Sequence, residues 1–395
     1  MILTDKQQRG LEIALERYEN NERYTVISGY AGTGKSTLVR AIIEAIGLPS
    51  EKVCYATFTG KAAQVLQQMG NRNATTLHKL LYESKPRGDG TFIHIPKTEL
   101  EYNLVVVDEV SMAPKEMMKL LFGHRHVYII CLGDPFQLPP INENENNHIL
   151  DEPHIFLDEI MRQAAESEII QISMDIREGR PLNPFDGKEV KIINKNDFNI
   201  GMLKWADQII VGTNQMRHKI NNEMRQRLGR GNMPEDGDKV ICLRNYWEKH
   251  GSDGMPLING SIGYLKNPYK SWVRIPPWVN NGKLESFEVI YGDIITDSDE
   301  EYRGLMMDKK QILTGVKSIS DPKIAYKISA NRKTAHLLPL EFEYGYAITC
   351  HKAQGSQWGN VLVFEERFPF DKEEHARWLY TAVTRAVNKI IIVKA

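Results

Sequence analysis

The 395-residue sequence contains no unbroken apolar run approaching the roughly 18 residues that a membrane-spanning helix needs. Its first residues show no basic stretch followed by an apolar one, so we expect no signal peptide and a cytoplasmic location. Only four cysteines occur, Cys54, Cys131, Cys242 and Cys350, and they are widely scattered. This spacing favours neither a disulfide framework nor a zinc site, so we expect buried, reduced thiols.

The sequence also lacks an excess of charge of either sign. Lys and Arg number 50 against 51 Asp and Glu, which gives a formal net charge of −1. Such a balance provides no global electrostatic signature of nucleic-acid binding. Any site for a polyanion must therefore be a local groove. The chain is long enough for two or three domains, each with its own core.

One segment has the pattern of a phosphate-binding loop: Gly29-Tyr30-Ala31-Gly32-Thr33-Gly34-Lys35-Ser36. It lies between a strand-like run, Tyr24–Ser28, and an apolar-periodic helix that begins at Thr37. In this pattern the glycines let backbone N–H groups surround phosphates, and the helix N-terminus adds its dipole. Lys35 would reach the β and γ oxygens and Ser36 would ligate Mg²⁺. The sequence therefore predicts a nucleotide site built from residues 29 and 31–37.

Two carboxylates follow a fully apolar run, Leu104–Val107, at the expected edge of the same sheet. Asp108 would lie beside the Mg²⁺ held by Ser36, and Glu109 could orient and deprotonate an attacking water. The alternative is a solvated acidic turn after a core strand, which the upstream phosphate loop disfavours. Gln137, within Gly133–Pro140 after the next apolar run, could sense the γ-phosphate, although a proline-rich turn is a serious alternative.

Strand-like runs alternate with helical stretches twice along the chain, which predicts two parallel sheets covered by helices. The first series is Tyr24–Ser28, Val53–Thr57, Leu104–Val107 and Val127–Leu132; the second is Val190–Ile193, Gln208–Thr213, Tyr346–Thr349, Asn360–Phe364 and Ile390–Val393. Residues 238–339 are rich in Gly, Pro, Trp and Tyr with short β-like runs, which indicates an inserted small β-domain. Residues 82–97 read as a projecting β-hairpin.

An ordered series of segments resembles the motifs of superfamily 1 helicases, and more narrowly the subgroup that contains the RecD and phage Dda helicases. The series runs through nearly the whole chain: Leu3–Gln7, the phosphate loop, Thr57–Ala63, Ala74–Leu81, Asp108–Met112, Gly133–Pro140, Glu159–Gln163, Thr213-Asn214 with Arg217 and Asn221, Thr349–Ser356 and Leu379–Ala386. The resemblance implies an α/β fold of two RecA-like lobes, with the hairpin inserted in the first and a small β-barrel inserted in the second. The implied lobes are residues 1–81 with 98–165, and 166–237 with 340–395.

The resemblance implies an ATP-dependent DNA helicase that moves 5′ to 3′ along single-stranded DNA and opens duplex at a fork. Gln7 would read adenine, Gly355 would belong to the nucleotide site, and Arg162 and Arg385 would reach the γ-phosphate when the lobes close. Residues implied to face the DNA strand are Thr59, Lys61, His78, Thr213, Asn214, Thr349, His351 and Lys352, with Phe92 on the hairpin stacking at the fork. For the histidines alone a structural role is the commoner one, and for Phe92 a packing role is equally plausible.

Two positions depart from the family pattern: Phe58 stands where relatives often have Pro, and Gln357 stands where they often have an acid that binds ribose. The second leaves nucleotide selectivity open, although an amide can still bond a ribose hydroxyl. Five tryptophans read as core or domain-packing aromatics and not as base stackers: Trp247, Trp272, Trp278, Trp358 and Trp378.

The resemblance is to a compact, phage-type motor in a bacterial or phage-infected cell, without the N-terminal extension or nuclease domain of some relatives. Protein partners are not identified by the sequence; a single-strand-binding protein and a replisome component are candidates. Two alternatives stay open: an RNA-directed helicase, and a P-loop ATPase switch that does not unwind nucleic acid.

Overall fold

The computed structural model describes residues 3–86, 92–139, 147–252, 254, 256–279, 285–297, 299–331, 333–366 and 371–394. Its backbone contacts divide the chain into two compact units. Unit 1 comprises Met1–Tyr82, Pro96–Thr213 and Ile348–Ala395, and unit 2 comprises Glu83–Ile95 and Asn214–Ala347. Unit 1 thus contains both sheets expected for the two lobes. Unit 2 covers most of the residues that the sequence-based division assigned to the two inserts, and also residues 214–237 and 340–347, which that division assigned to the second lobe.

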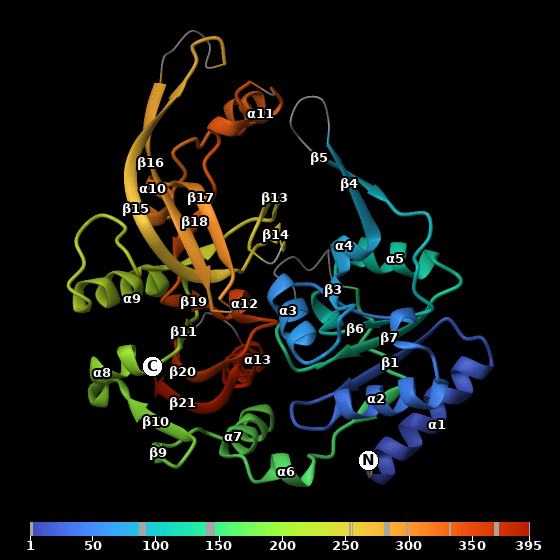
Figure 1. Ribbon diagram of the computed structural model, residues 1–395. Coiled ribbons are helices and arrows are strands. Elements are labelled where there is room, and N and C mark those ends of the chain that lie inside the picture. The colour runs from blue at the N-terminus through green and yellow to red at the C-terminus, as the bar shows by residue number, and fades with distance from the viewer. Residues whose placement is uncertain are drawn as a thin grey trace. The chain divides into compact units, whose positions relative to one another are not determined.

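The first sheet of unit 1 has six parallel strands in the order β3-β2-β6-β7-β1-β8. Figure 1 labels β3, β6, β7 and β1 of this sheet. The four strands predicted from the sequence are confirmed to within one residue, and the short strands β3 and β8 were not predicted. Their bounds are β1 Tyr24–Gly29, β2 Val53–Thr57, β3 Thr75–Thr76, β6 Leu104–Val107, β7 Tyr128–Gly133 and β8 Ile155–Leu157.

Alternation along the apolar strands builds one core on each face of this sheet. Leu104 and Val106 belong to the core beneath α1 (Asp5–Glu19) and α2 (Lys35–Ile46), whereas Val105 and Val107 belong to the core beneath α4 (Leu77–Leu81) and α5 (Lys115–Gly123). All four side chains are at most 1% exposed. Burial of each valine or leucine contributes about 1.5–3 kcal/mol, so β6 is a fixed support for the two acids that follow it. Helix α3 (Gly60–Gln68) follows β2.

The second sheet of unit 1 also has six strands, in the order β19-β11-β20-β21-β10-β9. Strands β11, β20, β21 and β10 are parallel, and β9 pairs antiparallel with β10. The five strands predicted here are confirmed, with ends shifted by up to four residues. The elements are α6 Arg162–Ala165, α7 Glu168–Arg177, β9 Phe185–Asp186, β10 Val190–Asn194, α8 Gly201–Trp205, β11 Gln208–Val211, β19 Ala347–Thr349, α12 Cys350–Ala353, β20 Trp358–Phe364, α13 Lys372–Val383 and β21 Ala386–Lys394.

Unit 2 is built on an antiparallel five-stranded sheet, β17-β16-β15-β12-β18. A parallel bridge joins Met307 at one edge to Leu340, two residues before β18 at the other edge. The elements are α9 Asn214–Arg227, β12 Lys239–Cys242, β13 Tyr246–His250, β14 Pro256–Leu257, β15 Ile262–Ile275, β16 Glu285–Thr296, β17 Glu301–Asp308, α10 Lys309–Thr314, α11 Pro322–Ser329 and β18 Phe342–Tyr344. The long pair β15 and β16 forms the curved ribbon in Figure 1.

Two short strands, β4 (Tyr82–Pro86) and β5 (Phe92–Pro96), form a separate two-stranded sheet at the expected hairpin. The connection at residues 87–91 and the side chain of Phe92 lie outside the described residues. Short 3₁₀ helices occur at Ser50–Lys52, Val110–Met112, Lys195–Asp197 and Ala335–Leu337.

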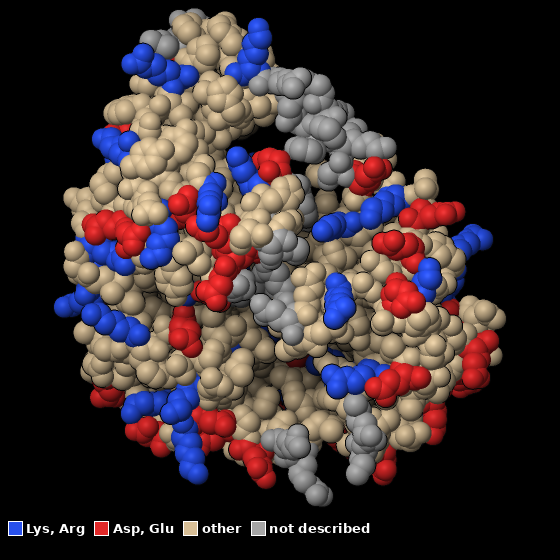
Figure 2. Space-filling view, in the orientation of Figure 1, with Lys and Arg blue, Asp and Glu red and all other residues tan. Residues whose placement is uncertain are grey.

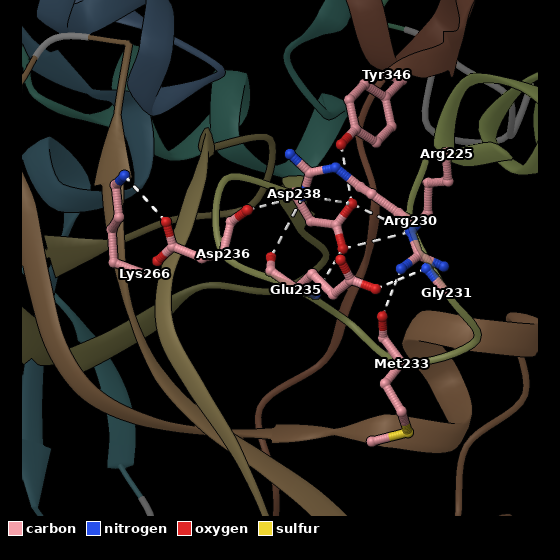
Figure 3. Close-up of polar contacts among 9 residues, drawn as sticks. All are labelled: Arg225, Arg230, Gly231, Met233, Glu235, Asp236, Asp238, Lys266 and Tyr346. Carbon is pink, nitrogen blue, oxygen red and sulfur yellow. Dashed lines mark hydrogen bonds and ion pairs between the residues drawn. The ribbon is translucent and has the colours of Figure 1, made fainter. Parts of the chain in front are cut away.

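A buried charge cluster in unit 2 surrounds Asp238, which is 0% exposed (Figure 3). Its carboxylate accepts hydrogen bonds from Arg225 Nε at 3.1 Å, from the Tyr346 hydroxyl at 2.9 Å and from the Glu235 amide at 2.7 Å, and pairs with Arg230 Nη1 at 3.1 Å. Burial and the neighbouring carboxylate raise the pKa of Tyr346, so its hydroxyl stays protonated and donates. The cluster ties the end of α9 and the following loop to the segment that precedes β19.

Acidic and basic side chains are interspersed over the face shown in Figure 2, in agreement with the balanced composition. Within the described part of the chain, no helix combines the length and apolarity needed to cross a bilayer. The four cysteines are buried thiols, as predicted. The expectation for the tryptophans was wrong at two positions, because Trp272 is 58% and Trp278 60% exposed, whereas Trp358 and Trp378 are buried.

Candidate functional site

A cavity of about 340 Å³ in unit 1 lies at the ends of strands from both sheets. The first sheet contributes the phosphate loop after β1, the acids after β6 and the loop after β7. The second contributes residues from α7, from the turn before β20 and from the end of α13. The lining residues are Tyr30, Ala31, Gly32, Gly34, Lys35, Ser36, Asp108, Glu109, Gly133, Asp134, Gln137, Ile169, Ile170, Gln357, Thr384, Arg385 and Ala386.

The phosphate loop has the backbone shape that its glycines permit. Gly34 caps α2 with φ +79°, and a Cβ there would stand 2.4 Å from Gln7 Nε2, so only glycine fits. Lys35 Nζ donates to the loop's own carbonyls, at 2.6 Å from Gly29 O and 2.9 Å from Tyr30 O. Burial lowers the pKa of Lys35, opposed by the charges of Asp134 and Asp108. A phosphate would replace the two carbonyls as partner of this cation.

The two acids after β6, Asp108 and Glu109, lie in different environments. Burial raises the pKa of Asp108 to about 6, and the Glu109 carboxylate beside it acts in the same direction. Asp108 Oδ1 accepts the Glu109 N–H at 2.9 Å. Glu109 has φ +49° and ψ +46°, a left-handed conformation that costs a non-glycine residue about 1–2 kcal/mol. The fold therefore holds Glu109 in a strained position facing the cavity, and a cation beside Asp108 would relieve the crowding of negative charge.

Arg385 meets Glu109 across the cavity. The guanidinium is 3% exposed, and its Nη1 donates to Glu109 Oε1 at 3.3 Å. Its Nε donates to Thr381 O at 3.0 Å and its Nη2 to the Thr384 hydroxyl at 3.2 Å. These bonds to the end of α13 orient the arginine toward the acids of the first sheet.

A second contact between α13 and segments of the first sheet was not predicted. The Tyr380 hydroxyl on α13 donates to Asp134 Oδ2 at 2.6 Å and accepts the Ala31 N–H of the phosphate loop at 2.9 Å. The Leu138 N–H donates to the Thr381 hydroxyl at 2.9 Å. Asp134 and Tyr380 both lie in segments that carry the family resemblance. The sequence contains no signal that these two residues contact each other.

One predicted nucleotide contact, that of Gln7, is arranged differently in the structure. Gln7 is 1% exposed and does not line the cavity; its amide accepts the Thr4 N–H at 3.0 Å and donates to Gly34 O at 3.2 Å, so contact with adenine would require an exchange of partners. Gln357 is exposed at the cavity wall. The side chain of Arg162 lies outside the described residues, but the preceding Met161 N–H bonds Gly32 O at 2.9 Å, which brings α6 to the phosphate loop.

Gly355, predicted for the nucleotide site, is not among the residues that line the cavity, and it lies beside Thr59, which was predicted to face DNA. Gly355, at φ +72°, lies against Thr59, because a Cβ at Gly355 would be 2.6 Å from Thr59 Oγ1. Thr349, His351 and Lys352 lie at the N-cap and within α12, immediately before Gly355, and burial lowers the pKa of His351, which favours its neutral form.

The structure gives contacts or positions for three of the other residues predicted to face DNA. His78 stacks on Tyr82, with ring centroids 4.7 Å apart. The Thr213 hydroxyl donates to Glu366 at 2.7 Å. Asn214 begins α9 in unit 2. The side chains of Lys61 and Phe92 lie outside the described residues.

Two family models match the chain. One described as an AAA domain matches residues 3–198, and one described as a UvrD-like helicase C-terminal domain matches residues 344–393. Together with a phosphate loop, an acidic strand end and an arginine from a second sheet around one cavity, these matches define a P-loop protein of the helicase class.

Comparison with relatives that match nearly the whole of this chain identifies the family within this class. The chain is 31% identical to the RecBCD enzyme subunit RecD of Mycolicibacterium smegmatis over 99% of this chain and 71% of that protein. It is 29% identical to the ATP-dependent RecD2 DNA helicase of Deinococcus radiodurans, covering 93% of this chain but only 46% of that protein. The chain belongs to the RecD-like family of superfamily 1 helicases, and the predicted family resemblance is confirmed.

A solved structure agrees with the fold. The Pif1 helicase from Bacteroides in complex with ADP-AlF3 and ssDNA superposes with a TM-score of 0.52 at 18% identity, covering 99% of this chain and 92% of that chain. At this identity the likeness shows the fold alone, the α/β fold of a Pif1-type superfamily 1 helicase.

Proposed function

We propose that the chain is an ATP-dependent DNA helicase that moves 5′ to 3′ along single-stranded DNA and opens duplex at a fork. The observation that carries the proposal is the convergence of Lys35, Glu109 and Arg385 on one cavity between two sheets. Phosphoryl transfer to water requires three groups: a cation that binds the phosphates, an acid placed to act as the base, and an arginine from the opposite sheet. The name of the RecD2 relative, an ATP-dependent DNA helicase, supports DNA as the partner.

In this proposal the phosphate loop and Lys35 hold the ATP phosphates, and Glu109 orients and deprotonates the attacking water. Ser36 and Asp108 line the same cavity and have the oxygen ligands that suit Mg²⁺. When bound, Mg²⁺ would supply charge neutralisation at the phosphate oxygens. Arg385 stabilises the charge of the transition state, and Gln137, in the loop bonded to α13, senses the γ-phosphate.

The DNA strand is proposed to contact Thr59, which lies against Gly355, and the residues Thr349, His351 and Lys352 of the α12 segment that precedes Gly355. Nucleotide binding and release would alter the spacing between the two sheets and so the grip on the strand. The five-stranded sheet of unit 2, with its edges joined at Met307 and Leu340, is proposed to be a small barrel that clamps the strand. The β4–β5 hairpin is proposed to be the pin that divides the duplex.

The proposal is tested by ATP hydrolysis with and without single-stranded DNA or RNA, and by unwinding of duplexes with a 5′ or a 3′ single-stranded tail. We expect hydrolysis stimulated by DNA more than by RNA, and unwinding only of the 5′-tailed duplex. The control is Lys35→Ala, which should abolish hydrolysis with the fold intact, because the hydrogen bonds of Lys35 within the described part of the chain go to carbonyls of its own loop. Turnover by this variant close to that of the parent chain would refute the ATPase assignment.

A further inference from the structure

The Tyr380 hydroxyl connects three segments of unit 1. It donates a hydrogen bond to the Asp134 carboxylate in the loop after β7 and accepts one from the Ala31 N–H in the phosphate loop. Tyr380 itself lies on α13. The side chain is 1% exposed and Asp134 is 4% exposed, so water cannot substitute for either bond. We call this contact the Tyr380 junction, formed by Tyr380, Asp134 and Ala31.

Two further bonds extend the junction along the loop after β7. Thr381 accepts the Leu138 N–H at 2.9 Å, and Arg377 Nη1 donates to Pro135 O at 3.1 Å. Successive turns of α13 are therefore bonded to the same loop, which also contains Gln137. The backbone of α13 ends at Val383, two residues before Arg385. Any displacement of α13 relative to the phosphate loop would consequently move Arg385 relative to Glu109.

The charges around the junction give the hydroxyl a defined orientation. Burial raises the pKa of Asp134, opposed by the charge of Lys35 and by the hydrogen bond from Tyr380. Burial also raises the pKa of Tyr380, so the hydroxyl stays protonated and donates a hydrogen bond to the Asp134 carboxylate. The remaining lone pairs of the oxygen face the Ala31 N–H. A phenylalanine at this position would keep the ring packing and remove both bonds.

We propose that Tyr380 is a positioning residue for ATP hydrolysis: its hydroxyl fixes α13 against the phosphate loop and thereby places Arg385 for the transition state. This inference rests on the proposed function. Tyr380 acts through Arg385 and through the loop that carries Gln137, and is not itself placed among the residues that line the cavity. Misplacement of a reacting group by about 1 Å can lower a rate by on the order of 100-fold, so loss of the junction should appear mainly in kcat.

The test compares Tyr380→Phe with a matched control, Tyr128→Phe. Tyr128 is also in unit 1 and 6% exposed, and its hydroxyl likewise makes two buried contacts, to Thr25 Oγ1 at 2.5 Å and to Ala14 O at 3.2 Å. It does not line the cavity. Both variants therefore lose one buried hydroxyl with two partners, and only one of them loses the junction.

We expect Tyr380→Phe to lower the DNA-stimulated kcat by about 10-fold or more, while KM for ATP and the Kd of a non-hydrolysable ATP analogue change by less than about 2-fold. Tyr128→Phe should leave all three within about 2-fold of the parent chain. Equal kcat values for the two variants would overturn the inference, as would a raised KM with unchanged kcat, because that pattern indicates a role in ground-state binding.

Measurements on the parent chain and on a second variant distinguish failure of the proposed function from failure of this inference. Absence of ATP hydrolysis by the parent chain would overturn the proposed function and this inference together, whereas a fully active parent with a fully active Tyr380→Phe overturns the inference alone. Thr381→Val decides the matter if Tyr380→Phe does not fold, since it removes the acceptor for Leu138 on the same face of α13. It should lower kcat at constant KM, because the Leu138–Thr381 bond also holds α13 against the loop after β7, and normal kcat would refute the positioning of Arg385 through α13.

Discussion

Replacement of Arg385 by alanine should separate its role in turnover from its role in holding Glu109. The guanidinium donates to Glu109, Thr381 and Thr384 while 3% exposed. Removing one partner of a fully buried ion pair costs about 3–5 kcal/mol. The Glu109 side chain is 24% exposed, so water can take over part of the solvation, and we expect a loss of about 1–3 kcal/mol in unfolding free energy.

The effect on turnover should be larger. Arginines that reach a transferring phosphoryl group raise kcat by about 10³-fold or more, and a loss of 10³-fold corresponds to about 4 kcal/mol of transition-state stabilisation. Arg385→Lys is the matched variant, because it keeps the positive charge near Glu109 and loses the planar fork. We expect the lysine variant to recover most of the stability and little of the turnover.

The assays are steady-state ATP hydrolysis with saturating single-stranded DNA, binding of a fluorescent ATP analogue, and urea-induced unfolding. A fall in kcat with nucleotide affinity changed by less than about 5-fold is the expected result, since the contact strengthens mainly in the transition state. Equal losses in kcat and in nucleotide affinity would refute the reasoning and assign Arg385 to ground-state binding.

Glu109→Gln should bind ATP and DNA but lower hydrolysis by about 100-fold or more, because the amide keeps the shape and loses the base; hydrolysis within a few-fold of the parent rate would exclude Glu109 as the base. Asp238→Asn should lower the unfolding free energy of unit 2 by about 3–5 kcal/mol, since Asp238 is the buried counter-charge of two arginines. Its control, Asp236→Asn, should lose less than about 1 kcal/mol, because Asp236 is 58% exposed and pairs with an exposed lysine; similar losses in urea titrations of the two would contradict the burial argument. Phe92→Ala should weaken unwinding while translocation and ATPase stay near normal, since one stacking contact is worth about 1–3 kcal/mol; unchanged unwinding rejects the pin, and a matching loss of thermal stability indicates packing.

Local sequence was sufficient for the elements whose identity depends on neighbouring residues. The apolar run Leu104–Val107 became a buried strand, and the glycine pattern before Lys35 became the turn from β1 into α2. Strand edges in a parallel sheet bring such turns together, which is why Asp108 and Lys35 were expected in one site and line one cavity. The short strands β3, β8 and β9 were missed, because runs of two or three residues have no readable period.

The sequence by itself determined the phosphate loop, the two alternating series of strands and the order of the helicase motifs, because each depends on residues close together in the chain. The tertiary structure alone decided which partners those residues meet. Glu109 and Arg385 are separated by 276 positions, and Ala31 and Tyr380 by 349, yet both pairs are in hydrogen-bond contact. The exposure of Trp272 was likewise decided by the neighbouring elements of unit 2. Periodicity records which face of an element is buried, whereas the partner of a buried polar group is chosen by the packing of distant elements, where an unpaired donor or acceptor is too costly to leave.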